Sequence, residues 1–239
     1  MKRTSVSIIL LCGVLFGASA FADNHTNKDI DPSPDVDPKL EVALRAYEHR
    51  DFKKALRLLS PIATRGEVQA QFIVARLYAQ GLGTKKDTNE AEGWYRKAAE
   101  QGHPRAQFRL AMALDRKKIK RYPESLALLR KAAKAGHPRA QFWLANKYTY
   151  NNEAPHSVAM WRYWVRRSAY QGDSYARMDL AESYFFGILV PKKDLVLALM
   201  WTILAGKSGH PGAKSCNEII SKRITPKQIR EAKRLAKLW

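Results

Sequence analysis

Histidine, a common metal ligand and acid–base group near neutral pH, recurs at one kind of position in this chain. His103, His137 and His210 each follow a glycine and precede a proline. Neighbouring packed helices lie about 10 Å apart, whereas zinc needs several donor atoms within about 2 Å. The pattern therefore predicts no metal site, and we interpret each histidine as a polar residue beside the start of a helix.

Sequence motifs that carry catalysis are absent from the 239 residues. There is no H-E-x-x-H, C-x-x-C, G-x-S-x-G or S-x-x-K motif. Lys207-Ser208-Gly209 superficially resembles a K-T-G element, but it falls at the expected end of a helix. The loop 81–86, GLGTKK, could be imagined around a phosphate, but no strand is expected before it. We expect a protein that is not an enzyme, with no catalytic, cofactor-binding or metal-binding residues.

Basic residues recur in pairs that could bind a partner of opposite charge. The pairs stand six and five residues before three of the regularly spaced glycines: Arg96–Lys97, Arg130–Lys131 and Arg166–Arg167. In stacked helical units such pairs would align into a ladder. The alternative interpretation is a solvated face that belongs to the repeat pattern itself.

A second candidate surface combines arginine with aromatic residues. Its members stand three or seven residues after the glycines: Arg105, Arg109, Arg139, Trp143 and Tyr175. Arginine and aromatic side chains are enriched at protein interfaces and at their energetic hot spots. The alternative is that these are ordinary exposed or half-packed positions.

The elements that must position these side chains follow a repeat. Its glycines are 36, 34, 36 and 37 residues apart: Gly66, Gly102, Gly136, Gly172 and Gly209. Alanine follows four residues after each glycine, and in the first four units apolar residues follow at eight, nine and twelve. This helical spacing predicts one buried stripe. A second helix ends at each glycine, which suits the left-handed position after a helix. Three prolines are expected in the first turn of the following helix: Pro104, Pro138 and Pro211.

Each unit is thus a helical hairpin that cannot bury both faces alone, so neighbouring units must stack. We predict an all-α fold, an α/α superhelical solenoid of about five to six hairpins with a capping helix from Pro226 to Trp239. The expected units lie near 39–65, 66–101, 102–135, 136–171, 172–208 and 209–239.

The segment 77–111, LYAQGLGTKKDTNEAEGWYRKAAEQGHPRAQFRLA, resembles the Sel-one-like repeat, a relative of the tetratricopeptide repeat. The closing ITPKQIREAKRLAKLW resembles the terminal helix of bacterial members. The glycine pair Gly81–Gly83 has no counterpart around Lys117–Tyr122 and Asn151–His156, and Leu189 replaces the second glycine after Gly187, so the resemblance does not fix those loop shapes. The resemblance implies an adaptor scaffold, of the kind that assembles complexes, often in bacterial envelopes. It also implies that the first helix of each unit lines a groove.

The first 38 residues indicate export. Lys2 and Arg3 precede an apolar run and then small residues, which predicts a signal peptide over 1–22, cut after Ala22. Residues 23–38 hold five aspartates and three prolines and are expected to be an acidic linker. No later segment is apolar enough to span a membrane. Cleavage would leave Cys216 as the only cysteine, and its apolar surroundings predict burial.

The charge of the chain points to an acidic partner. The formal net charge is +20, of which the leader carries +2, the linker −4 and residues 39–239 +22. We expect a periplasmic or secreted adaptor that binds an acidic protein. The alternative is direct binding of anionic envelope polymers, such as acidic polysaccharide, peptidoglycan or lipopolysaccharide. Nucleic acid suits the charge, but an exported protein does not meet it as a physiological ligand.

Overall fold

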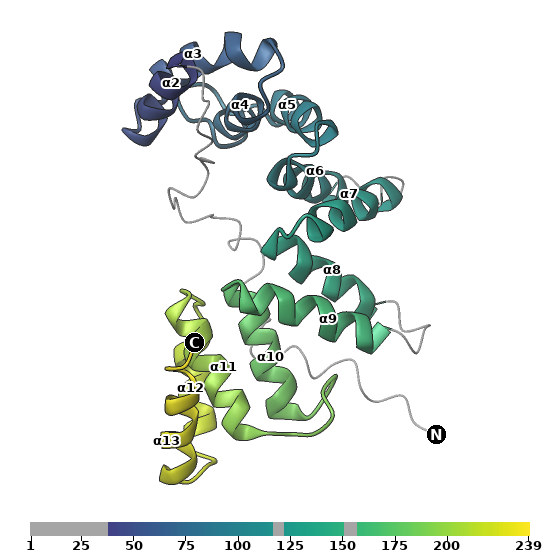
Figure 1. Cartoon of the computed structure of the whole chain (residues 1–239), viewed down its shortest axis with the longest axis vertical. Coiled ribbons are helices and arrows are strands. Elements are labelled where there is room, and N and C mark those ends of the chain that lie inside the picture. The colour runs from purple at the N-terminus through teal and green to yellow at the C-terminus, as the bar shows by residue number, and fades with distance from the viewer. Residues whose placement is uncertain (1–37, 117–121, 151–156) are drawn as a thin grey trace. The chain divides into compact units, whose positions relative to one another are not determined.

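The computed structural model describes residues 38–116, 122–150 and 157–239 (Figure 1). Regular structure in these ranges is entirely α-helical, and consecutive helices form antiparallel hairpins. The helices are α2 (Pro38–Glu48), α3 (Phe52–Thr64), α4 (Val68–Gln80), α5 (Thr88–Glu100), α6 (Pro104–Arg116), α7 (Tyr122–Lys134), α8 (Pro138–Tyr150), α9 (Ser157–Tyr170), α10 (Ser174–Phe186), α11 (Leu195–Lys207), α12 (Ala213–Ser221) and α13 (Pro226–Leu235). The predicted all-α hairpin fold is confirmed.

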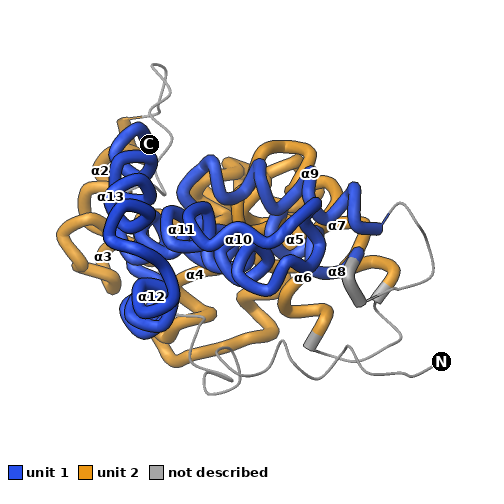
Figure 2. Tube along the Cα trace, turned by 90° about the horizontal axis from the view of Figure 1, so that it is seen from below, with its two compact units in different colours: residues 1–24, 141–239 blue, residues 25–140 orange. Residues whose placement is uncertain are grey.

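The chain divides into two compact units, which Figure 2 colours separately. Unit 2 is His25–Ala140, and unit 1 combines Gln141–Trp239 with Met1–Asn24. The division falls within α8. In the described part of the chain, unit 2 contains α2 to α7 and unit 1 contains α9 to α13. We call α4, α6, α8, α10 and α12 the A helices, because each opens a repeat, and α5, α7, α9, α11 and α13 the B helices.

The five repeat glycines end α3, α5, α7, α9 and α11 as predicted. All five adopt left-handed backbone angles, with φ between +80° and +101°. After each glycine the next backbone N–H donates to a carbonyl five residues earlier, as from His103 to Ala98 (3.1 Å) and from His137 to Ala132 (3.0 Å). This bond satisfies a carbonyl that the helix end would otherwise leave unpaired.

In four of the five repeats, the residue after the glycine also starts the next helix. The Nδ1 atoms of His103 and His137 accept the backbone N–H of Ala106 and Ala140, at 3.2 and 3.1 Å. Glu67 and Asp173 accept the equivalent N–H groups with their carboxylates. These are N-caps, which supply an acceptor to an orphan donor of the first turn. The histidines are therefore helix caps, as their polar position before a proline predicted.

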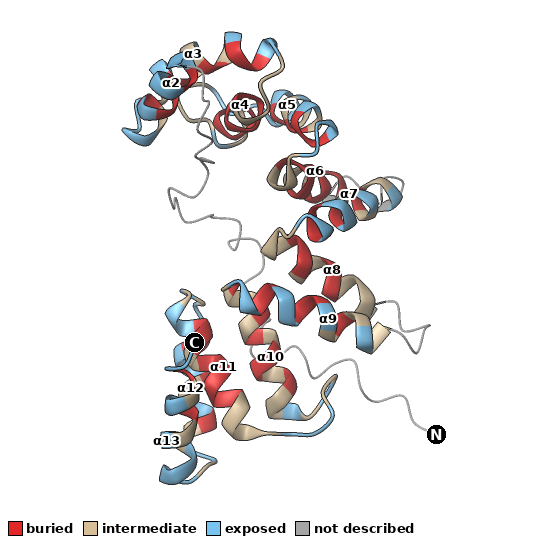
Figure 3. Ribbon diagram, viewed as in Figure 1, coloured by how far each residue is buried: buried red, intermediate tan, exposed pale blue. Residues whose placement is uncertain are grey.

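The core follows the predicted stripe, and Figure 3 shows its buried positions along the helices of each unit. The alanines four residues after the glycines are at most 3% exposed: Ala70, Ala106, Ala140, Ala176 and Ala213. The residues eight and nine after the first four glycines are at most 2% exposed. Small residues at the helix contacts let the helices approach closely. Cys216 is buried, as expected.

A buried glutamine follows the alanine in three A helices and ties neighbouring hairpins together. Gln71 Nε2 donates to the carbonyl of Ala63 (3.1 Å), and Gln71 Oε1 accepts from Gln101 Nε2 (2.9 Å). Gln141 Oε1 accepts from Gln171 in the same way (2.8 Å). In α10 the position is Arg177, which donates to the carbonyls of Ala169 and Leu204 at 2.9 and 3.1 Å.

The C-terminal hairpin departs from the predicted bounds. Pro211 lies in a turn, and α12 begins only at Ala213, because His210 Nδ1 accepts the N–H of Gly212 (3.2 Å) two residues on rather than three. The capping helix α13 packs on α11 but ends at Leu235 rather than Trp239. Trp239 still contacts the stack, since its ring lies 5.3 Å from that of Trp201.

Several predictions fall outside the described residues: the signal peptide 1–22, the linker up to residue 37, and the loops 117–121 and 151–156. Within the ranges that the structure covers, none of the helices has the length and apolar character needed to cross a membrane.

Candidate functional site

Three of the predicted arginines converge in unit 2. Arg105 and Arg109 project from α6 and Arg139 from α8, and all three are half-buried around the imidazole of His137. Burial lowers the pKa of His137 to about 3, and the positive charges of the three arginines and of His103 add to this shift. The imidazole is thus neutral at physiological pH, as its role as an acceptor in the α8 cap requires.

A fourth arginine, which the sequence patterns missed, joins this group from α4. Arg76 is 2% exposed, and its guanidinium lies 5.6 Å from the ring centre of Tyr47. Burial lowers the pKa of Arg76; the nearby Tyr95 opposes the shift and the charge of Arg105 adds to it. We call Arg76, Arg105, Arg109 and Arg139 the A-helix arginine cluster. Arg76 stands ten residues after Gly66, on the same helical face as positions three and seven, so extending the pattern by one turn would have found it.

The two predicted aromatic members lie in unit 1. The ring of Phe142 lies 6.3 Å from that of Trp143 and 6.1 Å from that of Tyr175. Tyr175 also packs edge-on against His210, at 4.9 Å between ring centres. Trp143 and Tyr175 are therefore half-buried members of one aromatic row along the A helices.

The predicted ladder of basic pairs is not uniform. Arg96 forms ion pairs with Glu124 (2.5 Å) and Glu92 (3.4 Å), and Lys97 lies 4.0 Å from the ring centre of Trp94. The remaining members are exposed: Arg130, Lys131, Arg166 and Arg167. In unit 2 the B-helix face thus carries carboxylates beside its arginine, so the sequence spacing alone overstates its positive charge.

In unit 1 the B-helix face holds a hollow lined by aromatic rings. Tyr170 lies 4.7 Å from Trp239 and 6.0 Å from Trp201 between ring centres. The hollow encloses about 280 Å³, and Arg166 is part of its wall. Tyr170 and Trp239 are both about half exposed, at 53% and 54%. We call this the aromatic hollow.

A pair of carboxyl groups on α10 was also missed by the sequence analysis. Burial raises the pKa of Asp179 to about 6, and Asp173 adds to this, against a hydrogen bond from Trp161. Burial raises the pKa of Glu182 to about 7, and the charge of Asp179 adds to it. The two residues share one helical face at a spacing of three, which is a sequence signal, but their burial is set by other helices.

Two loops considered for chemistry have structural roles. A Cβ on Gly83 would lie 2.5 Å from the backbone carbonyl carbon of Phe52, so the loop 81–86 packs against the start of α3 rather than opening around an anion. The hydroxyl of Ser208 accepts a hydrogen bond from Arg177 at the end of α11. Among the described residues, no three histidine, cysteine or acidic side chains are grouped so that they could hold a metal ion.

The repeat is recognised by comparison with known proteins. The family model of the Sel1 repeat matches residues 68–103, 104–137 and 174–210. The chitin synthase regulatory factor 3 of Schizosaccharomyces pombe is 38% identical over 58 residues, 24% of this chain and 6% of that protein. The chain thus matches only a small part of that curated relative.

Solved structures share the fold. The crystal structure of c5321, a protective antigen of uropathogenic Escherichia coli strains with this fold, is 26% identical over 83% of this chain and 51% of its own (TM-score 0.59). A Sel1 repeat protein from Oxalobacter formigenes is 23% identical over 83% and 86% (TM-score 0.67). The immunity protein Pa5087 of Pseudomonas aeruginosa is 21% identical over 87% and 84% (TM-score 0.56).

These matches agree with the glycine-marked hairpins and the buried alanine stripe. Proteins of this kind are repeat scaffolds that often bind other proteins and are typically not enzymes. The chain belongs to the Sel1-like repeat family.

Proposed function

We propose that this protein is an exported, non-enzymatic adaptor that binds an acidic segment of a partner protein, chiefly through the half-buried Arg105, Arg109 and Arg139 of the A-helix arginine cluster. The observation that carries the proposal is the convergence of Arg105, Arg109 and Arg139 around a neutral imidazole. Half-buried arginines bind carboxylates with better geometry than lysines, because the planar guanidinium offers paired donors.

The charge of the chain supports this assignment. Residues 39–239 carry a formal charge of +22, which favours encounter with acidic surfaces and weakens as salt rises. The partner would contribute aspartate or glutamate side chains to the cluster. Relatives described as an immunity protein and a protective antigen support a role in recognition rather than catalysis.

The test is a pull-down from envelope extract at low salt with matched variants. The double variant Arg105→Gln/Arg109→Gln should lose the acidic proteins that the unaltered chain retains. The control Arg130→Gln/Lys131→Gln removes the same charge from the exposed B-helix face and should retain them. Equal recovery by both double variants, or no recovered protein with the unaltered chain, would refute the proposal.

Export is a separate part of the proposal and has its own test. The basic start, the apolar run and the small residues before Ala22 support cleavage there and release into the periplasm or medium. Mass spectrometry of the protein from cell fractions should find a mature N-terminus at Asp23 outside the cytoplasm. A full-length cytoplasmic product would exclude this location.

The aromatic hollow favours a second candidate, direct binding of an anionic envelope polymer. A sugar ring could stack on Tyr170 or Trp239 while its carboxylate pairs with Arg166. Co-sedimentation with purified peptidoglycan or acidic polysaccharide should then fall at high salt and fall with Tyr170→Ala. Unchanged sedimentation in the Tyr170→Ala variant would exclude this candidate.

A further inference from the structure

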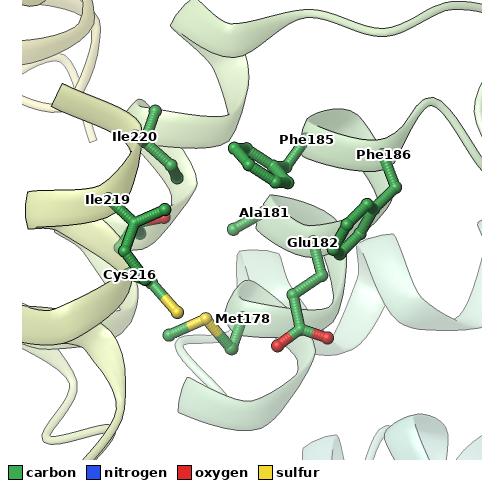
Figure 4. A pocket seen from close by; sticks show the side chains of 9 residues that line it. Met178, Ala181, Glu182, Phe185, Phe186, Cys216, Ile219 and Ile220 are labelled. Atoms are coloured by element: carbon green, nitrogen blue, oxygen red, sulfur yellow. The ribbon is translucent and has the colours of Figure 1, made fainter. Parts of the chain in front are cut away.

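Unit 1 contains an apolar groove that shares no residue with the arginine cluster or the aromatic hollow. It lies between α10 and α12, and Figure 4 shows the side chains that line it. Phe185 and Ala181 come from α10, and Ile219 and Ile220 face them from α12. The groove encloses about 330 Å³ including its open mouth, at the small end of the roughly 300–1,000 Å³ of ligand pockets. A groove of this size admits side chains of a partner rather than a large cofactor.

The interior of the groove offers almost no polar group to an occupant. Thr202 is one of two lining residues with side-chain oxygen atoms, and its hydroxyl already donates to the carbonyl of Ala198 (2.8 Å). Glu182 is the other, and burial raises the pKa of its carboxyl group to about 7, with the charge of Asp179 adding to the shift. About half of the Glu182 side chains are therefore uncharged near pH 7. The inserted part of an occupant must be apolar, because a polar group would lose its water without gaining a hydrogen bond.

The two walls of the groove continue as apolar surface outside it. Phe186 of α10 is 45% exposed and Ile219 of α12 is 41% exposed, although both are large apolar side chains. Exposed apolar side chains that border a groove form the kind of patch that a partner covers. A single acyl chain in the groove would leave both walls exposed, whereas a helix laid along the mouth covers them. The apolar surface therefore fits a protein segment better than a small amphiphile.

Lysine and arginine border the mouth of the groove. Lys193 Nζ and Arg223 Cζ lie 5.5 and 5.0 Å from the ring centre of Phe185, which is part of the lining. Lys193 stands in the loop before α11 and Arg223 follows α12, so two different elements bring positive charge to the same ring. Each is preceded in the sequence by another exposed lysine, Lys192 and Lys222. Within the part of the chain that the structure describes, neither Lys193 nor Arg223 forms an ion pair, so both charges remain available to an anion.

Fewer carboxylates accompany these cations. The carboxylate of Asp194 is engaged in the N-cap of α11, where it accepts the backbone N–H groups of Val196 and Leu197 at 3.0 Å each. Glu218 is exposed on α12. The four cations outnumber these two carboxylates, so the mouth is positive and favours an anionic neighbour.

We propose that the groove between α10 and α12 binds an amphipathic acidic segment of a partner protein, which inserts an apolar side chain beside Ile219 and places aspartate or glutamate side chains beside Lys193 and Arg223. Amphipathic helices bind grooves in this way, through apolar side chains spaced along one helical face. The inference rests on the proposed adaptor function, but it places a second site for acidic segments in unit 1 that does not need the arginine cluster of unit 2. Recognition there requires both apolar and acidic side chains.

The probe is a fluorescein-labelled peptide of about 12 residues that repeats Leu-Glu-Glu-Leu, an amphipathic acidic helix. Fluorescence anisotropy at pH 7.5 should show saturable binding to the full mature chain. General attraction to a basic protein is measured with a peptide that has serine in place of leucine and keeps every charge. This peptide should bind at least about tenfold more weakly, because it has no apolar face to bury. A peptide of the same composition in which the leucines no longer share a helical face should be weakened as well.

One pair of matched variants tests the cations at the mouth. Lys193→Gln/Arg223→Gln should weaken binding of the Leu-Glu-Glu-Leu peptide about fivefold, since exposed charge pairs contribute modestly. Arg130→Gln/Lys131→Gln removes the same charge from an exposed face of unit 2 and should leave the affinity unchanged.

A second pair tests the apolar rim. Ile219→Ser should weaken binding through the lost apolar contact, while Val42→Ser makes a similar change at an exposed position of α2 and should have no effect. Circular dichroism would verify that each variant is folded.

Four results would overturn the proposal. The first is equal affinity of the leucine and serine peptides, which would reduce the binding to charge alone, and the second is equal affinity of the Ile219→Ser and Val42→Ser variants. The third is loss of peptide binding in Arg105→Gln/Arg109→Gln but not in Lys193→Gln/Arg223→Gln, which would assign the peptide to the arginine cluster. The fourth is displacement of the peptide by octanoate at an equal concentration, which would assign the groove to a free anionic amphiphile. Absence of peptide binding would leave the pull-down test of the arginine cluster unaffected, so the two proposals fail separately.

Discussion

The Nδ1 atom of His137 accepts the backbone N–H of Ala140 at 3.1 Å and so caps α8 with a neutral imidazole. The same residue ends the preceding helix, because its backbone N–H donates to Ala132 at 3.0 Å. Its ring stacks on Phe108, at 4.9 Å between ring centres. The side chain therefore caps α8 only in its unprotonated state, since a protonated Nδ1 can no longer accept a hydrogen bond.

The His137 cap predicts a loss of stability in acid. The folded-state pKa of about 3 is below the unfolded value of 6.5, so the contribution is complete above pH 6.5 and is lost as the pH falls toward 3. The loss should approach about 1.4 kcal/mol per pH unit in this window. Urea unfolding at pH 7 and pH 4 measures how far the free energy of unfolding falls in acid. This fall should be smaller for His137→Asn, which keeps a capping oxygen, than for the unaltered protein. The exposed His49→Asn is the control and should not change the pH effect.

The carboxyl pair on α10 predicts the opposite pH dependence. The folded-state pKa of Glu182, about 7, is above its ordinary 4.5, so its stabilising contribution is complete below pH 4.5 and is lost as the pH rises through 7. Glu182→Gln should raise the unfolding free energy at pH 8 by up to about 3 kcal/mol, with little effect at pH 4. Denaturant titrations at both pH values test this; an equal gain at pH 4 and pH 8 would contradict it.

Two glycines with left-handed angles should differ in their tolerance of a side chain. Gly66 has φ +101°, and a Cβ there would meet nothing within 4 Å, so Gly66→Ala should cost only the backbone strain of about 1–2 kcal/mol. Gly83 has φ +71°, and its Cβ would lie 2.5 Å from the backbone of Phe52. Gly83→Ala should therefore cost clearly more and displace the loop from α3. Similar urea midpoints for the two variants would contradict this prediction, because they would show that the loop moves away from α3 without loss of stability.

Of the three buried glutamines of the described A helices, Gln107 lacks the hydrogen-bond donor that Gln71 and Gln141 have, which predicts a stabilising substitution. Gln71 and Gln141 each accept from a glutamine that precedes the next repeat glycine, but Ala135 stands at that position opposite Gln107. Among the described residues, the buried Oε1 of Gln107 accepts no hydrogen bond. Ala135→Gln should supply the donor and raise the unfolding free energy by about 0.5–1.5 kcal/mol. In a Gln107→Leu background the gain should vanish; a persisting gain would mean that helix propensity, not this bond, is the cause.

Local sequence determined the repeat. A glycine that adopts a left-handed angle, an alanine four residues later and apolar residues at helical spacing act within one or two turns, so their positions predicted hairpins and a buried stripe. The loop after α10 keeps the left-handed backbone of the loop after α4, although leucine replaces the second glycine. Leu189 adopts φ +60°, and the equivalent Gly83 adopts φ +71°. The end of α13 was less predictable, since Trp239 is held by contacts with Tyr170 and Trp201 from other helices.

The candidate sites depended on contacts between helices. The sequence placed Arg105, Arg109 and Arg139 at recurring positions, but only the packing of α4, α6 and α8 brought Arg76 to them and buried His137 among them. Asp179 and Glu182 look like an ordinary solvated pair until α9 and α12 surround their helix. The sequence by itself determined where most of the helices begin, end and turn their apolar face, because those preferences are local. Only the tertiary structure decided which charges are buried and which are paired, because desolvation and Coulomb energies depend on neighbours that lie far apart in the chain.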